Sequence, residues 1–517
     1  MPTNPMTLAT GIHSLQTLIL SFHPVIVIET VEEERVQALL KTTIQEMKTL
    51  LFEWSITQGL VRSPMSANSH WVNEYAPPGT TKPTAFENTT EPLAMLKHIE
   101  EMSGKGVFLL KDFAKHLDDA TLARQFREVA QQFAQRHSTL VLTGDNINLP
   151  AEIAHSAVYY DLKLPSREEL FQATSDVVRS LQNKNHIQAQ LQPQDVQTLV
   201  QALSGMTLNQ ARQVIAYAAL EDGKLTVRDI DRVLQRKAQI IREGGLLEYL
   251  PVKDSPSELG GFVGLKHWLS CAKVGFSAQA QALNLQPPKG ILIVGIQGCG
   301  KSLAAKAIAR EWQMPLLKLD AGRLYDKYIG ESEKNFRQAI KLAESMAPTV
   351  LWIDEIEKSF GGSNNESDGG LSRRLFGSFL TWMQEKSQEV FVVATANDIS
   401  NLPPELLRKG RFDEIFFVDL PDAQEREVIV RIHLALRKQS PERFNLTELV
   451  TATEGFSGAE IEQAVISALY QSLYLKQPLD TALLVQAIRG IIPLSVSRRE
   501  ELLQLRAIAK ERFVSVK

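Results

Sequence analysis

The feature that most restricts the fold is a glycine-rich turn between an apolar run and a helical pattern. Residues 291–302 read ILIVGIQGCGKS, and the segment LAAKAIAREW that follows has helical spacing. This matches G-x-x-x-x-G-K-[ST] in the strand-to-helix context that a phosphate-binding loop requires. Glycines let the backbone surround a phosphate, and the N–H groups point at it from the positive end of a helix dipole. A glycine-rich turn with a chance lysine is the competing interpretation, and the context argues against it.

The side chains of this turn have separate expected tasks. Lys301 is expected to reach the β- and γ-phosphates of a nucleotide, and the Ser302 hydroxyl is expected to hold Mg²⁺. Cys299 could act as a thiol switch, although a small residue that fits the loop is the simpler interpretation. The predicted nucleotide-binding residues of this segment are Gly295, Gly298, Cys299, Gly300, Lys301, Ser302 and Leu303.

An acidic strand end follows further along the chain. TVLWIDEIEK has a buried-strand pattern from Val350 to Ile353 and ends in Asp354 and Glu355. Asp354 is expected to hold Mg²⁺ through water, and Glu355 to polarise the attacking water. A strand that merely ends in acids is common, but the phosphate loop strengthens the functional interpretation. The next buried strand, EVFVVATAN, ends in Asn397, whose amide could orient the same water.

Two arginines lie on a short polar turn beyond that strand. LLRKGRFDEIFF carries Arg408 and Arg411 with a glycine between them. Two such cations could simply cover a surface. Alternatively, they could reach the γ-phosphate of a nucleotide bound by a neighbouring subunit.

The order of these motifs resembles the AAA branch of the AAA+ ATPases over about residues 255–490. The resemblance implies ATP and Mg²⁺ as cofactors and a ring of identical subunits, usually a hexamer. Ile296 and Gln297 stand where such proteins usually carry two prolines, which should alter loop rigidity more than phosphate contact. The motifs that carry the resemblance are ELGGFVGLK, PPKGILIVGIQGCGKS, KYIGESEKNFR, VLWIDEIEK, VVATAN, LLRKGRFD and EGFSGAEI.

The resemblance also implies roles for individual residues. Leu259 and Gly260 would contact adenine, and Asn397 would be the first sensor residue. Arg408 and Arg411 would act in trans as arginine fingers. The helical lid would touch the nucleotide through Gly458 and Ala459.

A further triplet, Tyr328-Ile329-Gly330, matches the loop that lines the central pore in the family and grips an extended polypeptide. An aromatic ring can bind many side chains without sequence preference, and glycine lets the loop swing. The competing interpretation is that Tyr328 packs in a core.

The two halves of the chain share an ordered outline that predicts a duplicated module. VFLLKDFAK (107–115) aligns with VLWIDEIEK, and STLVLTGDNINLPAEI (138–153) aligns with VFVVATANDISNLPPEL. In this register IVIETVEEERV aligns with ILIVGIQGCGKS, so that Arg35 replaces Lys301. Generic α/β patterning is the alternative explanation.

Carboxylates take the place of the glycines in the first copy, at Glu29, Glu32 and Glu34. Their side chains crowd a backbone that must approach phosphate closely. At about 6 Å and an effective dielectric constant of about 20, each carboxylate–phosphate pair costs about 2–3 kcal/mol before relaxation. We therefore expect a phosphate loop that no longer binds phosphate. The polar insertion at 61–90 could recruit a client or be a tolerated loop.

The chain is therefore predicted to be α/β, with two tandem AAA+ modules, each a three-layer parallel sheet plus a helical lid. The tail is expected to be a charged helix that packs on a neighbour, or else lies solvated. The expected segments are 1–165 (degenerate α/β domain), 166–245 (its lid), 246–257 (linker), 258–422 (ATPase domain), 423–490 (its lid) and 491–517 (tail).

Bulk properties exclude several other classes of protein. A net charge of −4 and a pI near 6.3 make nucleic-acid binding unexpected. Two cysteines are too few for a disulfide framework. No apolar run approaches the length of a membrane span. The first basic residue is Arg35, so neither a signal nor a transit peptide is expected, and the protein should be cytoplasmic, or stromal if plastid-encoded.

Taken together, the motifs predict a ring-forming ATPase that remodels or disassembles a protein client, with an inactive first module for assembly or client recognition. The alternative is a nucleotide-switched scaffold that does not thread substrates. A nucleic-acid translocase is less favoured because aromatic residues interleaved with basic ones are not evident. The whole-chain layout resembles AAA proteins of cyanobacteria and algal plastid genomes, which implies a link to photosynthesis or carbon supply.

Overall fold

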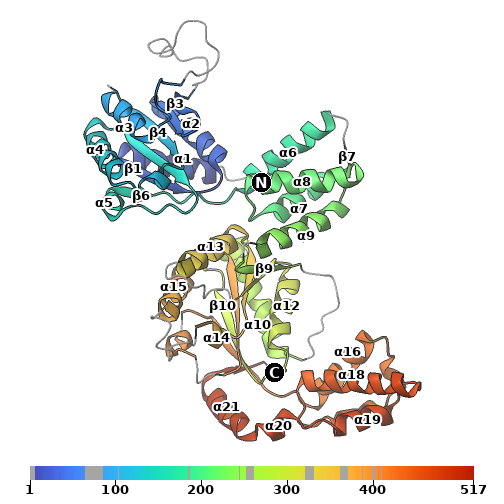
Figure 1. Ribbon diagram of the computed structural model, residues 1–517. Coiled ribbons are helices and arrows are strands. Elements are labelled where there is room, and N and C mark those ends of the chain that lie inside the picture. Colours follow the sequence, from blue (N-terminus) through green and yellow to red (C-terminus); the bar gives the residue numbers. More distant parts are fainter. Residues whose placement is uncertain are drawn as a thin grey trace. The chain divides into compact units, whose positions relative to one another are not determined.

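Two compact units make up the chain (Figure 1). The first holds Met1–Lys184 with Met206–Ala216, and the second holds Asn185–Gly205 with Tyr217–Lys517. The division runs through the helical segment expected at 166–245. The computed structural model describes residues 6–63, 85–102, 104–183, 187–243, 245–251, 261–320, 331–360, 371–386, 388–398, 402–408 and 410–516.

A six-stranded sheet with the order β3-β2-β4-β5-β1-β6 forms the centre of the first unit, and only β3 is antiparallel to its neighbour. Because alternate strand residues face opposite sides, β1 sends Val25 and Val27 to one core and Ile26 and Ile28 to the other. The strands are β1 Val25–Glu29, β2 Leu50–Ser55, β3 Gly59–Arg62, β4 Gly106–Lys111, β5 Thr139–Gly144 and β6 Ala157–Tyr159.

Helices cover both faces of this sheet, which gives the expected three layers (Figure 1). Leu15 of α1 and Leu40 of α2 pack on one face, whereas Met95 of α3 and Phe126 of α4 pack on the other. The helices are α1 Met6–Leu20, α2 Glu33–Met47, α3 Pro92–Glu101, α4 Ala120–Arg136, α5 Ala151–Ala154 and α6 Arg167–Asn183.

The second unit contains a seven-stranded sheet with the order β15-β14-β10-β13-β12-β11-β9, in which only β9 is antiparallel. Ile308 of α12 packs on one face and Phe379 of α15 on the other. The strands are β9 Leu247–Leu250, β10 Gly290–Gly295, β11 Leu316–Leu319, β12 Thr349–Ile353, β13 Val390–Ala396, β14 Glu414–Val418 and β15 Val514–Ser515. The helices beside the sheet are α10 Val263–Lys273, α11 Ala278–Ala282, α12 Lys301–Trp312, α13 Glu331–Ser345, α14 Ile356–Phe360 and α15 Leu371–Glu385.

The two sheets repeat one strand order. Reading the parallel core of each, β6-β1-β5-β4-β2 and β14-β10-β13-β12-β11 place the fifth, first, fourth, third and second strands side by side. Each sheet then adds an antiparallel strand beyond the second. The residues after the third strands, Asp112 and Glu355, both adopt left-handed backbone conformations with φ of 55° and 48°. A non-glycine residue rarely adopts this conformation, so the shared detail supports the alignment of the two halves.

The segment expected as a linker contributes an edge strand instead. Leu247–Leu250 forms β9, which pairs with β11, and Leu247 and Tyr249 are buried while the alternate residues are half-buried. Four residues are too few for this alternation to stand out in a sequence. Helix α9 packs on β9, and its buried Lys237 places Nζ 5.1 Å from the centre of the Tyr249 ring. The neighbouring elements are β7 Gln188–Ala189, α7 Pro193–Leu203, α8 Leu208–Asp222, β8 Lys224–Leu225 and α9 Arg228–Glu243.

A four-helix lid follows the second sheet. Leu434, Ile461, Ala468 and Leu484 lie in its own apolar core. Capping boxes begin two of its helices, with Asp422 and Glu425 at α16 and Ser457 and Glu460 at α18. The lid helices are α16 Ala423–Leu436, α17 Leu446–Ala452, α18 Gly458–Leu475 and α19 Thr481–Arg489.

The C-terminal tail contacts its own module through a strand and an ion pair, and its packing on a neighbouring subunit stays a prediction. After α20 (Leu494–Ser497) and α21 (Arg499–Arg512), strand β15 pairs in parallel with β14. Arg506 of α21 also binds Asp419 at 2.8 Å. The sequence showed the charged face of this helix but not the open sheet edge that accepts the strand. Among the helices that the structure describes, none is long and apolar enough to cross a membrane.

Gly290 offers a stability test within the second sheet. A Cβ atom there would lie 2.2 Å from the Val392 carbonyl oxygen, so a shift of the central strands is required. We expect Gly290→Ala to lower the free energy of unfolding by at least about 2 kcal/mol. The matched control is Gly377→Ala in α15, where a Cβ would meet nothing within 4 Å. Alanine favours helix, so this control should gain up to about 1 kcal/mol; equal unfolding curves for the two variants would contradict the close strand packing.

Candidate active site

The phosphate loop of the second unit occupies the turn between β10 and α12. Five residues, 296–300, separate the strand from the helix, and Gly300 is the N-cap residue. Gly298 and Gly300 have φ of 77° and 88°, a region that favours glycine. The loop therefore exposes the N-terminal N–H groups of α12, which have no partner within the helix.

Lys301 is the first residue of α12 and is 6 % exposed. Its Nζ donates to the carbonyl oxygens of Gly295 and Ile296, both at 2.8 Å. The side chain thus folds back over the loop. The phosphate oxygens of a bound nucleotide would replace these carbonyl oxygens as acceptors for Lys301 Nζ. Burial lowers the pKa of Lys301 to about 8.

A pH dependence of nucleotide affinity follows from this pKa. Bound phosphates favour the charged ammonium and raise the pKa of Lys301, so binding above about pH 8 must take up a proton. We expect the affinity for ATP to be level below about pH 8 and to fall by up to about tenfold per pH unit above it. Calorimetric titration in buffers of different ionisation enthalpy measures both the affinity for ATP and the number of protons taken up on binding. Lys301→Arg is the control, since arginine stays charged in this range; a wild-type profile as level as that of the control would exclude the linkage.

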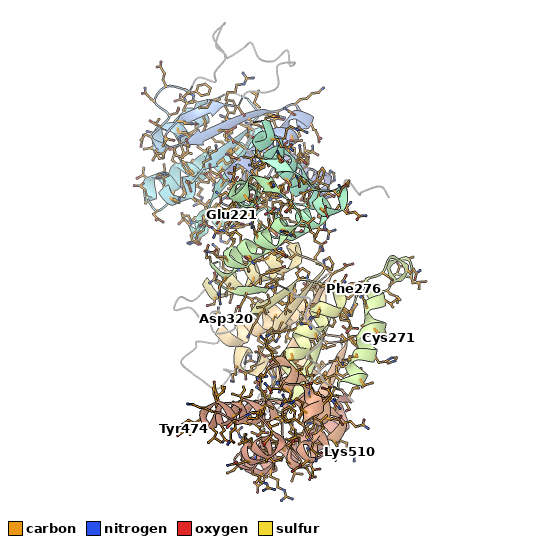
Figure 2. All side chains as sticks on the ribbon, turned by 90° about the vertical axis from the view of Figure 1, so that its right-hand side faces the viewer. Glu221, Cys271, Phe276, Asp320, Tyr474 and Lys510 are labelled. Carbon is orange, nitrogen blue, oxygen red and sulfur yellow. The ribbon has the colours of Figure 1, made fainter. Side chains whose placement is uncertain are left out.

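Cys299 differs from Cys271 in its surroundings. Cys271 on α10 is exposed (Figure 2), whereas Cys299 is buried in the loop. Burial raises the pKa of the Cys299 thiol to about 12. Because the thiolate is the reactive form, the structure favours the interpretation of Cys299 as a small loop residue over a thiol switch.

The metal-binding candidates converge beside the loop. The Ser302 hydroxyl donates to Asp354 Oδ1 at 3.2 Å, and Thr395 on β13 donates to the same oxygen at 2.7 Å. Lys318 lies 3.4 Å from Asp354 Oδ2. The carboxyl ends of neighbouring parallel strands bring these groups together. The sequence reasoning missed Thr395 and Lys318, although Thr395 is the polar residue within the apolar run VFVVATA.

Glu355 and Asn397 form the second part of the site. Asn397 Nδ2 donates to Glu355 Oε1 at 2.7 Å, and the Glu355 N–H donates to Thr395 Oγ1 at 3.0 Å. The structure thus places Glu355, the expected base, in direct contact with Asn397, which the family resemblance implies as a sensor residue. Strained backbone such as the left-handed Glu355 is typical of functional positions.

Glu357 on α14 is a further residue that sequence reasoning did not single out. It is 7 % exposed, and its Oε1 accepts the Asn397 N–H at 2.9 Å. Burial raises the pKa of this carboxyl group. Glu357 therefore accepts the backbone N–H of Asn397, while Glu355 accepts its side-chain amide.

The two candidate arginine fingers differ in their contacts. Arg411 is half-buried and donates to the Glu405 carbonyl oxygen. Arg408 is exposed, its backbone N–H donates to the Glu405 carbonyl oxygen, and its side chain has no hydrogen bond or ion pair with another described residue. Arg408 is thus the one of the two whose guanidinium group faces solvent.

The lid contacts the loop directly. The Ala459 N–H donates to the Gly298 carbonyl oxygen at 3.0 Å, and a Cβ on Gly298 would come within 3.0 Å of the Ala459 side chain. Gly458 also approaches the Gly298 carbonyl oxygen. Leu303, by contrast, is 40 % exposed on α12. The predicted residues Leu259, Gly260, Tyr328, Ile329 and Gly330 lie outside the described residues.

The acidic turn of the first unit is shorter than the phosphate loop, although the alignment drawn from the sequence assumed turns of equal length. Three residues, 30–32, separate β1 from α2, against five in the phosphate loop. Glu33 therefore begins the helix, and Arg35 is its third residue rather than the counterpart of Lys301. Sequence alignment alone could not locate this gap, because both turns lie between similar strands and helices.

Family comparisons divide the chain into three matched regions. Residues 291–420 match the family described as "ATPase family associated with various cellular activities (AAA)". Residues 12–162 match the N-terminal domain of SpoVK-like AAA ATPases, and residues 168–244 match their second domain. These matches agree with the resemblance carried by the sequence motifs.

Some similar proteins align with nearly the whole chain, and others align with about a third of it. The "Uncharacterized AAA domain-containing protein ycf46" of Guillardia theta is 36 % identical over 498 residues, which is 96 % of this chain and 94 % of that protein. The protein of the same name from Pyropia yezoensis is 36 % identical over 499 residues, 96 % of each chain. The "Cell division cycle protein 48 homolog" of Archaeoglobus fulgidus is 36 % identical over 184 residues, which is 35 % of this chain and 25 % of that protein.

Proposed function

Because the chain belongs to the AAA family of ATPases, alongside the AAA domain-containing ycf46 proteins of algae, we propose that it is a ring-forming machine that hydrolyses ATP to remodel or disassemble a protein client. Hydrolysis takes place in the second unit. The first unit is a second copy of the AAA+ module that no longer binds nucleotide and serves assembly or client recognition. The common strand order of the two sheets supports the duplication.

One observation carries the chemical part of this proposal. Ser302, Asp354, Glu355 and Asn397 converge at the carboxyl ends of β10, β12 and β13, with contacts of 3.2 Å and 2.7 Å within the two pairs. This is the set of groups needed to hold a triphosphate and activate water against it. Lys301 and the loop N–H groups bind the phosphates, while Asn397 and Glu355 orient the attacking water and accept its proton.

The residues present fit Mg²⁺. A hydroxyl and a carboxylate oxygen 3.2 Å apart are ligands of the kind that this ion prefers, and Mg²⁺ usually binds one or two side chains together with substrate phosphates. Ser302 and Asp354 would hold it. When bound, it would neutralise charge on the phosphates.

The exposure of Arg408 supports the proposed ring. Its side chain is exposed and is suited to reach a nucleotide held by the adjacent subunit. A closed ring of identical subunits gives each site one such neighbour, and we propose a hexamer. We place the protein in the cytoplasm, or in the plastid stroma where the gene is plastid-encoded, with a role linked to photosynthesis or carbon supply.

A test of remodelling against a nucleotide-switched scaffold uses Tyr328. We expect an unfolded polypeptide, such as reduced and carboxymethylated lactalbumin, to raise the ATPase rate of the wild type about twofold or more. Tyr328→Ala should abolish this rise because the aromatic grip is lost. Tyr325→Ala is the control, since it removes an aromatic ring from the same segment. If the polypeptide raises the ATPase rates of Tyr328→Ala and Tyr325→Ala equally, the scaffold is favoured. A second measurement is the mass of the Glu355→Gln protein with and without ATP, and no increase in mass with ATP would also count against the remodelling ring.

A further inference from the structure

Glu32 in the first unit is a buried carboxylate at a place where the sequence predicted only repulsion of phosphate. It is the N-cap residue of α2 and is 6 % exposed. Its backbone N–H donates to Thr30 Oγ1 at 3.0 Å, which holds the short turn in shape. Removing a charge from water is costly unless partners replace the water, so its contacts explain why it is there.

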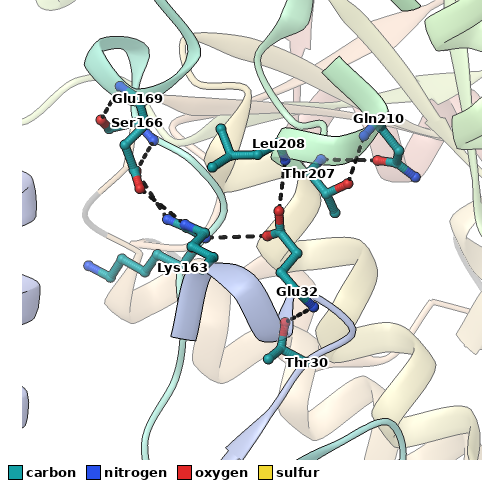
Figure 3. A network of polar contacts seen from close by, with 9 residues as sticks. Thr30, Glu32, Lys163, Ser166, Glu169, Thr207, Leu208 and Gln210 are labelled. Carbon is teal, nitrogen blue, oxygen red and sulfur yellow. Dashed lines mark hydrogen bonds and ion pairs between the residues drawn. The ribbon is translucent and has the colours of Figure 1, made fainter. Parts of the chain in front are cut away.

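The first partner of Glu32 is the beginning of helix α8 (Figure 3). Glu32 Oε1 accepts the Leu208 N–H at 2.7 Å. Thr207 and Gln210 form a capping box that satisfies two other donors of this helix end. The carboxylate of Glu32 thus occupies the remaining position at the positive end of the α8 dipole, where an anion is stabilised.

The second partner is Arg35, which extends the contact to helix α6. Its guanidinium group lies 3.4 Å from Glu32 Oε2 and binds both carboxylate oxygens of Glu169 at 3.1 Å (Figure 3). It also donates to the Lys163 carbonyl oxygen at 2.5 Å. Glu169 in turn accepts the Ser166 N–H at the start of α6. The side chains of Glu32 and Arg35, at the start of α2, therefore contact helices α8 and α6, which both follow the sheet in the sequence.

The equivalent place in the second unit is held differently. There, the Ala459 N–H at the start of α18 donates to the Gly298 carbonyl oxygen of the loop. Lys301 binds carbonyl oxygens of its own loop and no carboxylate at the helix start. The second unit thus joins its loop to the helix start through a backbone carbonyl oxygen, whereas the first unit uses a carboxylate.

We propose that Glu32 and Arg35 form an internal latch that replaces a nucleotide phosphate and fixes helices α6 and α8 to the α/β domain of the first unit. The latch keeps this unit in one closed arrangement whether or not ATP is present. The first unit therefore keeps one conformation through the ATP cycle of the second unit. The inference concerns contacts within the first unit and stands apart from the ATPase chemistry.

Hydrogen exchange of the full chain tests the latch. Without its acceptor, the N–H of the half-buried Leu208 is unpaired and Arg35 loses one partner, so Glu32→Ala should raise amide exchange in the first turn of α8 by about tenfold or more. The matched control is Glu34→Ala, which removes a carboxylate of the same turn that is 82 % exposed and 3.7 Å from Arg212. This control should change exchange by less than about twofold. Equal exchange in the two variants would overturn the latch.

Two milder variants keep the test decisive if Glu32→Ala unfolds the unit. Glu32→Gln retains an acceptor for Leu208 and should loosen α8 less than alanine does. Arg35→Lys loses the two-pronged contact with Glu169 and should loosen α6 more than α8. In the wild type, ATP should slow exchange around the phosphate loop of the second unit and leave α6 and α8 unchanged. Slower exchange of α8 on adding ATP, or no loosening in either mild variant, would overturn the proposal.

Discussion

Replacing Glu355 with glutamine should lower ATP hydrolysis by at least about 10²-fold while ATP remains bound, because general-base catalysis contributes about 10²–10⁴-fold. Glutamine matches the shape of glutamate and can still accept the Asn397 amide, which lies 2.7 Å from Glu355 Oε1. It cannot accept a proton from water. Single-turnover hydrolysis measures the chemical step, and a fluorescent nucleotide analogue measures binding.

The matched control for this variant is Glu357→Gln. Glu357 lies two residues further on and accepts the Asn397 N–H at 2.9 Å, a contact that glutamine preserves. We expect this variant to hydrolyse ATP within about tenfold of the wild-type rate, since no proton transfer is assigned to it. Unchanged steady-state hydrolysis in Glu355→Gln, or an equal loss in both variants, would show that Glu355 is not the base.

A mixture of two inactive variants should recover ATPase activity if Arg408 acts on the neighbouring subunit. Arg408→Ala removes the finger and keeps the site, whereas Lys301→Ala removes phosphate binding and keeps the finger. Each alone should lose at least about 10²-fold, because arginine fingers contribute about 10³–10⁵-fold. In a random equal mixture, about a quarter of the interfaces pair an intact site with an intact finger. We therefore expect the mixture to reach about that fraction of wild-type activity.

Arg411 provides the comparison for this experiment. Its guanidinium group is held by the Glu405 carbonyl oxygen, whereas Arg408 is exposed. Arg411→Ala should therefore shift the turn that carries Arg408 without removing the finger, and it should lower ATPase activity less than Arg408→Ala does. A mixture of Arg408→Ala and Lys301→Ala that stays inactive, although mass measurement shows mixed rings, would place the arginine in cis or outside the reaction.

The chemical core of the second unit was predictable because its signals are local. A glycine-rich loop between a strand and a helix, and polar residues directly after two buried strands, identify Lys301, Asp354, Glu355 and Asn397. Parallel strands end at one edge of the sheet, so the convergence of these residues follows from their order. Thr395 was not found, since a single threonine inside an apolar strand has no local signal for its partner across the sheet.

The pairing of the edge strands could not be predicted from the sequence either. Strand β9 at Leu247–Leu250 and strand β15 at Val514–Ser515 are short, and each is stabilised by an open sheet edge formed by distant residues. Short segments carry too little periodicity to separate a strand from a linker or tail. Their conformation depends on the partner strand.

By itself, the sequence determined that the chain has two related α/β units and that the first has lost its phosphate loop. That expectation rested on the carboxylates Glu29, Glu32 and Glu34, because like charges repel and side chains crowd the turn. Only the tertiary structure decided what Glu32 does instead, since its partner Leu208 lies far along the chain, as does Glu169, the partner of Arg35. A buried charge takes its role from the groups that replace water around it, and folding brings those groups together.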